Sequence, residues 1–414
     1  MKKIIILQIF SFFLGSSFSF YGYGEDIEDN QGKSQFITEL NDFNFGNQSS
    51  SIWENTLSIL SLQYNFTASE IINSDFADSY LSNISYTFPL SQTSYLTFGY
   101  NPSSISNARL FINNFSYIGS DELSVSDEAI AYNVLYDNDG GISKSYLNFV
   151  RKFSKKFYLG LKYSMIYGNL EQNKIIRLYD LEYSNDDQNN LDVDYTLNDS
   201  ILINSVNEFR GGSVQIETNF KSKYYDLILS TTYSLPLNIK NSFFFDENIE
   251  NMQNLEQLQT YFQPNQIISY EDSKGFKDAS VGFRYKIDDD YCWQLSLNHS
   301  KSYDYNGSML NPDLDINSLN LHYIKSKSFL NASNLDNSIT KIGLYYKNLG
   351  NQTMQEKDYG LTLDYGIRLK DKNYFSIFIK LGQKSYKYLH LDNESYQIFG
   401  FRMDNVEKWF LKGD

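Results

Sequence analysis

The chain has 414 residues, a net charge of -15 and one cysteine, and its 35 Tyr and 31 Phe help to bring aromatic residues to 17%. The negative charge argues against nucleic acid as a partner, because nothing neutralises phosphates, and the lone Cys292 excludes an intramolecular disulfide. The chain is polar on average, with a mean hydropathy of -0.44. A polar chain rich in aromatic residues is typical of a membrane β-barrel, whose lumen and loops are polar and whose rims carry aromatic girdles.

The first predicted element is a secretory signal peptide at residues 1–19. Lys2 and Lys3 form a basic start, Ile4–Leu14 is a short apolar core, and Ser17–Ser19 is a small-x-small cleavage site. An uncleaved anchor is the alternative. No later stretch approaches ~18 consecutive apolar residues, so the exported chain is either soluble or crosses a membrane as strands.

Strict alternation of apolar and polar residues then predicts antiparallel strand pairs, because successive strand side chains point to opposite faces. The pairs turn at three polar residues each, in chain order "SQT" (Ser91–Thr93), "SKK" (Ser154–Lys156), "KSK" (Lys221–Lys223) and "DDD" (Asp288–Asp290). A further pair occupies Tyr359–Gln383, where Phe378 is the one exception to the alternation. Single strands are predicted at Leu57–Phe66, Ile316–Ile324, Ser338–Lys347 and Tyr396–Met403.

The connections between these pairs are much longer than the turns within them, at roughly Ser103–Gly141, Asn169–Gly212 and Ser234–Lys277. Alternating short and long connections are the layout of an outer-membrane barrel, with periplasmic turns and extended outer loops. The apolar face of each strand then meets lipid, and the polar face meets the lumen. About a dozen strands are credible, and because bacterial barrels close with even numbers, 12, 14 and 16 are the open options.

Four segments resemble a divergent branch of the FadL-like family of outer-membrane long-chain fatty-acid and hydrocarbon transporters. They are "LTFGYNPSSISN" (Leu96–Asn107), the hairpin Gly140–Leu170, the hairpin Lys357–Lys384 and "ESYQIFGFRMDNVEKWF" (Glu394–Phe410). The resemblance covers about a third of the chain in the right order. It implies an all-β, transmembrane antiparallel barrel of fourteen strands in the bacterial outer membrane, with an N-terminal segment in the lumen.

The resemblance also implies three parts: the signal peptide at 1–19, a hatch at 20–50 and the barrel at 51–414. "FYGYGEDIED" (Phe20–Asp29) is similar to the Tyr/Gly segment that opens mature chains of this branch. The family's Asn-Pro-Ala signature is not visible in the segment that follows. No ligand residue is therefore carried over from the family.

No catalytic constellation stands out, so the chain is not expected to be an enzyme. The histidines are His299, His322 and His390, without metal-ligand spacing. Ser296 and His299 differ in parity, so they should lie on opposite faces of one strand. The pairs Gly140–Gly141 and Gly211–Gly212 are interpreted as turns, Cys292 as a small buried filler, and Trp409 and Phe410 as part of an aromatic belt. No catalytic, cofactor-binding or metal residue and no cofactor is predicted.

The sequence thus favours a monomeric outer-membrane barrel, in contact with outer-membrane lipid, that admits small hydrophobic molecules. Two alternatives stay open. One is a barrel that scaffolds surface binding or secretion, with its long acidic loops as the functional surface. The other is a polar diffusion porin.

Overall fold

A computed structural model describes residues 25–26, 58–71, 74–91, 93–105, 108–118, 130–154, 156–185, 191–235, 237–246, 268–273, 275–287, 291–303, 314–326, 338–350, 355–368, 374–386 and 393–407. The predicted signal peptide at 1–19 lies outside these residues, and so does the predicted hatch at 20–50 apart from Glu25 and Asp26. Among the residues that the structure describes, no helix is long and apolar enough to cross a membrane.

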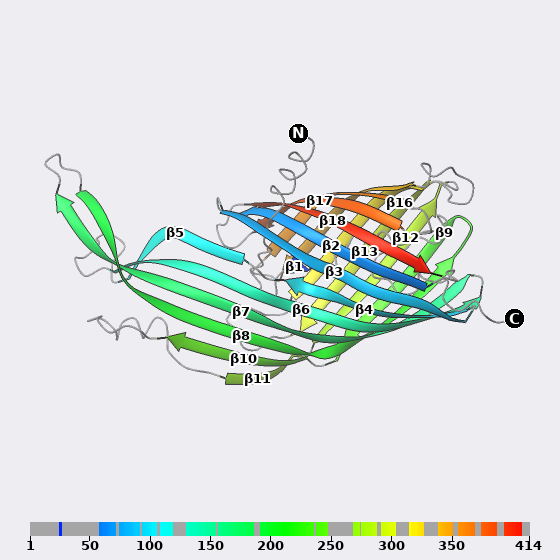
Figure 1. Cartoon of the computed structure of the whole chain (residues 1–414), viewed down its shortest axis with the longest axis horizontal. Coiled ribbons are helices and arrows are strands. Elements are labelled where there is room, and N and C mark those ends of the chain that lie inside the picture. The colour runs from blue at the N-terminus through cyan, green and yellow to red at the C-terminus, as the bar shows by residue number, and fades with distance from the viewer. Residues whose placement is uncertain are drawn as a thin grey trace.

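Fourteen strands form a closed antiparallel barrel (Figure 1). The barrel closes because β18 pairs with β2 from Ser395–Glu70 at one end to Glu407–Ser58 at the other. Closure satisfies every strand edge, which a hydrocarbon solvent demands. In order of pairing the strands are β2 (Ser58–Ile71), β3 (Ser74–Ser91), β4 (Ser94–Ile105), β6 (Ile130–Ser154), β7 (Phe157–Asn185), β8 (Leu191–Lys221), β9 (Tyr225–Ser234), β12 (Gly275–Lys286), β13 (Tyr291–Tyr303), β14 (Leu314–Ser326), β15 (Ser338–Gly350), β16 (Gln355–Arg368), β17 (Tyr374–Tyr386) and β18 (Glu394–Glu407).

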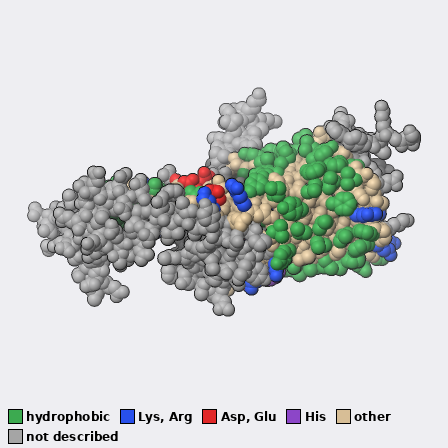
Figure 2. Space-filling model, turned by 90° about the horizontal axis from the view of Figure 1, so that it is seen from below, with side chains coloured by type: hydrophobic (Ala, Val, Ile, Leu, Met, Phe, Trp, Pro, Cys, Tyr) green, Lys and Arg blue, Asp and Glu red, His purple; other side chains and the backbone are tan. Residues whose placement is uncertain are grey.

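The predicted hairpins and the sorting of side chains by parity are confirmed. On β7 the outward residues Leu161, Tyr163 and Met165 are 49%, 46% and 56% exposed, whereas the alternate residues Lys162 and Ser164 are buried. The outward apolar band on β7 runs from 157 to 167, about the 9–11 residues that a tilted strand needs to cross a bilayer. Figure 2 shows hydrophobic side chains spread over this part of the exterior. The apolar parity therefore faces lipid and the polar parity faces the lumen.

Beyond the barrel lies an open sheet, here called the arm, into which three barrel strands continue (Figure 1). It consists of the outer parts of β6, β7 and β8 together with β5 (Ala108–Ile118), β10 (Leu237–Asp246) and β11 (Ile268–Ser273). The segments 103–141, 169–212 and 234–277 were predicted as long connections, and for most of their described residues this is wrong, because they are strands. Parity did not find these strands because their residues do not alternate strictly between apolar and polar.

Glycines lie in the strands where the barrel passes into the arm. Gly140 has φ 110°, and a Cβ there would overlap the Asn169 carbonyl oxygen of β7. Gly168 of β7 lies against β6 so closely that its own Cβ would overlap the Gly141 carbonyl oxygen. The interpretation of Gly140–Gly141 as a turn is wrong, and so is that of Gly211–Gly212, because both pairs lie within strands. Gly140 and Gly168 allow close approach of long neighbouring strands.

The ends of the described chain meet the barrel at two places. β1 (Glu25–Asp26) pairs with Ile105 and Ser104 of β4, just before the arm begins. The predicted last strand at 396–403 is confirmed, and as β18 it is longer at both ends. The predicted aromatic-belt residues Trp409 and Phe410 lie outside the described residues.

Candidate functional site

The lumen near the short turns contains a buried group of charged side chains. Asp226 begins β9, and Arg284 and Lys286 end the neighbouring strand β12. Arg284 Nη1 donates to Asp226 Oδ2 at 3.1 Å, and Lys286 Nζ donates to Oδ1 at 3.3 Å. The three side chains are 1% (Arg284), 7% (Lys286) and 4% (Asp226) exposed. One carboxylate thus neutralises two cations that the bulk solvent does not reach.

A second lumenal group bridges the seam where the barrel closes. Arg402 and Asp404 belong to β18, and Ser61 belongs to β2. Arg402 Nε lies 2.9 Å from Asp404 Oδ1, its Nη2 donates to Ser61 Oγ at 2.6 Å, and Ser61 donates to Asp404. These side-chain bonds connect residues more than 340 positions apart in sequence. They add to the backbone pairing at the junction of the first and last barrel strands.

A third group lies on β15 to β18 towards the other end of the barrel. The Tyr396 hydroxyl donates to Asp358 at 2.7 and 2.9 Å and lies 2.7 Å from the Tyr345 hydroxyl. Lys380 Nζ is 3.8 Å from Asp358 Oδ2 and 4.2 Å from the centre of the Tyr345 ring. A cation held between an aromatic face and a carboxylate is well compensated away from water. The wall is therefore packed rather than open at this level.

Phe378, the exception to alternation in the sequence, has a structural reason. It points into the lumen and is buried with Tyr345, Tyr396 and Ile398. Its ring lies over Gly400 of β18, where a Cβ would overlap it. A large lumenal ring on one strand thus fills the space that a glycine leaves on the next.

The lumenal face changes character where β7 and β8 enter the arm. Within the barrel it carries Lys162, Ser164, Ser213 and Glu217, all buried and polar. Further along the same face the described buried side chains are largely apolar, with Asn207 the exception. The apolar residues of this face are Ile166, Leu170, Ile176, Leu178, Ile201 and Phe209, which we call the apolar arm face.

The register of β7 and β8 makes the apolar arm face continuous. Ile176 is directly opposite Ile201, and Phe209 is opposite Gly168. Their side chains are 0% (Ile176), 0% (Ile201) and 3% (Phe209) exposed. Lys174 also lies on this face, and burial lowers the pKa of its ammonium group below the usual range. An apolar environment that disfavours charge thus begins where the polar lumen ends.

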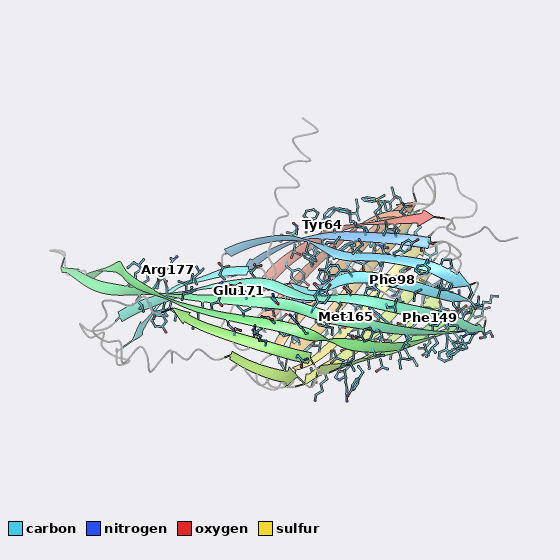
Figure 3. All side chains as sticks on the ribbon, turned by 60° about the horizontal axis from the view of Figure 1, so that its bottom comes forward. Tyr64, Phe98, Phe149, Met165, Glu171 and Arg177 are labelled. Carbon is cyan, nitrogen blue, oxygen red and sulfur yellow. The ribbon has the colours of Figure 1, made fainter. Side chains whose placement is uncertain are left out.

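The opposite, outward face of β7 and β8 changes from apolar to polar where these strands enter the arm. Beyond Tyr167 the outward positions carry Glu171, Asn173 and Asn204, and Asn204 Nδ2 donates to both neighbours at 2.7 Å. Figure 3 shows Glu171 on the arm and Met165 on the barrel part of the same ribbon. In Figure 2 acidic and basic side chains gather where the green band ends. The outward face thus turns polar at the level where the inner face turns apolar.

A surface ion pair lies on the same outward side. Lys240 of β10 contacts Glu208 of β8 at 2.8 Å, and the two residues are cross-strand partners. The hydrogen bond from Lys240 holds the pKa of the Glu208 carboxyl below its usual range. Both side chains are about a third exposed, at 37% for Lys240 and 31% for Glu208.

The residues weighed as chemical candidates lie apart. Ser296 and His299 are on opposite faces of β13, as predicted; His299 faces outward with a ring nitrogen 2.8 Å from Asn317 Oδ1. His322 faces the lumen, Cys292 is fully buried on the lumenal side, and His390 lies outside the described residues. In the described part of the chain, no group of three or more His, Cys, Asp or Glu could hold a metal ion.

Sequence reasoning named none of the lumenal groups. Their signal was present, since Asp226, Arg284 and Asp358 are charged residues at the polar positions of predicted strands. Their pairing could not be read from the sequence, because the partners of Asp226 are 58 and 60 residues away.

No protein-family model matches the chain, and no curated protein sequence matches it. Among solved structures, the CymD monoaromatic hydrocarbon channel superposes with a TM-score of 0.52 at 8% identity, covering 94% of this chain and 97% of that chain. A Pseudomonas aeruginosa FadL homologue superposes with a TM-score of 0.55 at 9% identity, covering 95% and 100%. The resemblance seen in four segments therefore extends to the tertiary structure: this chain has the barrel fold of the CymD channel and of the FadL homologue.

Proposed function

We propose that this protein is a monomeric channel that admits small hydrophobic molecules across the bacterial outer membrane. The observation that carries the proposal is the change on the lumenal face of β7 and β8, from buried polar residues in the barrel to the apolar arm face beyond it. Apolar surroundings at this level favour a hydrophobic molecule, whereas the charged lumen beyond them does not. The solved structures with this fold include a monoaromatic hydrocarbon channel.

The lumenal groups argue against the polar diffusion porin. Water-filled porins need exposed polar walls, whereas Arg284, Asp226 and Asp404 are at most 4% exposed. Charged side chains that are this well covered do not line an open aqueous pore. The surface scaffold stays an alternative because the arm offers a large sheet outside the barrel. The scaffold hypothesis predicts that changes on the apolar arm face leave uptake unchanged.

Uptake of a lipophilic fluorescent probe by vesicles that contain the purified barrel tests the proposal. We expect Leu170→Asn with Phe209→Asn to reduce uptake severalfold, because both changes place amides on the apolar arm face. Leu202→Asn is the matched control, since Leu202 lies on the outward face of β8 and is 36% exposed. Retained β-sheet circular dichroism shows that the variants fold. Equal uptake by wild type and the double variant would contradict transport along this face and favour the scaffold.

We also propose that residues 20–50 restrict the lumen as a hatch. Support comes from the family resemblance and from the pairing of Glu25 and Asp26 with β4. Deletion of Phe20–Ser50 is expected to raise uptake of the same probe. An unchanged rate in a folded deletion variant would refute the hatch.

A further inference from the structure

We infer that the short-turn end of β6 to β9 binds the headgroups of anionic phospholipids. The sequence concentrates positive charge at two turns, "RKFSKKF" from Arg151 to Phe157 and "FKSKYY" from Phe220 to Tyr225, neither of which contains an acidic residue. This is unusual in a chain of net charge -15. The next turn along this rim reads "DDD" (Asp288–Asp290), so the positive charge ends there on that side.

The structure brings the two turns side by side. The backbone N–H of Lys221 donates to the carbonyl oxygen of Lys156 at 2.9 Å, and Phe157 is the cross-strand partner of Phe220. Arg151, Lys156 and Lys223 are exposed, and together we call them the basic rim. Three cations from two hairpins therefore share one patch of surface.

Aromatic rings place the basic rim at the level of the lipid headgroups. Phe153, Phe157 and Phe220 form a row with ring centres 6.0 and 5.0 Å apart. Phe153 and Phe220 are 57% and 45% exposed at the end of the outward apolar band. Outer-membrane barrels carry girdles of aromatic residues at both membrane interfaces, so the row marks where hydrocarbon ends and headgroups begin.

The cations are held against this aromatic surface. Arg151 Cζ lies 5.6 Å from the centre of the Phe153 ring, and Lys223 Nζ lies 5.1 Å from that of Tyr224. The charged end of each side chain thus lies over an aromatic ring at the rim, which favours a cation there. Basic clusters next to a membrane attract anionic lipids. Because short turns of such barrels lie on the periplasmic side, the partner is a phospholipid such as phosphatidylglycerol in the inner leaflet.

Native mass spectrometry of the full-length barrel, titrated in detergent with phosphatidylglycerol or phosphatidylcholine, tests this inference. The test variant is Arg151→Gln with Lys156→Gln and Lys223→Gln. The control variant, Arg210→Gln with Lys277→Gln and Lys357→Gln, removes the same charge from exposed positions towards the arm end. We expect wild type to prefer phosphatidylglycerol and the rim variant to lose roughly tenfold to a hundredfold in affinity for it. The control should keep wild-type affinity.

Several results would overturn the assignment. They are equal binding of the two lipids by wild type, an unchanged affinity of the rim variant, or an equal loss in rim and control variants, which would reflect net charge alone. Binding of polyglutamate in place of phosphatidylglycerol would point to an acidic protein partner instead. If the triple variant does not fold, Lys223→Gln alone replaces it, with an expected loss of about fivefold. The probe-uptake assay is independent of this measurement.

Discussion

Replacing Asp226 by Asn should strongly destabilise the barrel. Asp226 contacts both Arg284 and Lys286, at 3.1 and 3.3 Å. With Asn in its place both cations stay buried, at 1% and 7% exposure, and lose the charge of this carboxylate. Breaking a buried ion pair by removing one partner costs about 3–5 kcal/mol. We expect the free energy of unfolding of Asp226→Asn to fall by about this amount.

Urea-induced unfolding in lipid vesicles, followed by tryptophan fluorescence, measures this loss. The double variant Asp226→Asn with Arg284→Gln should recover part of it, because one uncompensated charge is then removed; contacting residues couple by about 0.5–3 kcal/mol. Glu208→Gln is the matched control, since its ion pair with Lys240 is shorter at 2.8 Å but exposed. Exposed pairs contribute little to stability. A loss in Glu208→Gln equal to that in Asp226→Asn would refute the reasoning, since burial would not decide the cost.

Three further predictions concern single positions. Phe378→Ala should cost about 3–5 kcal/mol of unfolding free energy, because the ring is buried in the lumen with three neighbours; Ile379→Ala, on the outward face and 37% exposed, should cost clearly less in the same urea assay. Gly360→Ala should lower the unfolding temperature, measured as the temperature at which the band of the folded barrel disappears on a denaturing gel, because the added Cβ would overlap the Leu381 carbonyl oxygen. Gly212→Ala should leave this temperature unchanged, since the nearest atom to its added Cβ is 3.2 Å away. Lys240→Gln should raise the pKa of Glu208 towards the ordinary carboxyl range, because the hydrogen bond that holds it down is lost; carboxyl carbon NMR across the acidic range checks this, and an unchanged pKa would contradict it.

The sign of the Glu208 effect on stability follows from the same contact. The folded pKa is below the unfolded one, so the carboxylate contributes stability above the unfolded pKa. This contribution is lost as pH falls through the folded pKa. The pH dependence of unfolding in Lys240→Gln should therefore be flatter on the acidic side of the ordinary carboxyl range.

The sequence by itself determined the strands of the barrel and their orientation. Alternation is a local property: a residue such as Leu361 or Thr362 reveals its face through its immediate neighbours, because lipid and lumen are such different solvents. The short polar turns identified the hairpins, because a turn is also a local feature of the sequence. The buried position of Cys292 also followed from parity.

Only the tertiary structure decided the rest. It set the strand count at fourteen, because closure depends on pairing the first and last strands across the length of the chain. It showed the arm, whose residues do not alternate strictly between apolar and polar. It also paired the lumenal charges, such as Arg402 with Ser61. Contacts of this kind depend on which distant strands become neighbours, and local periodicity carries no information about that.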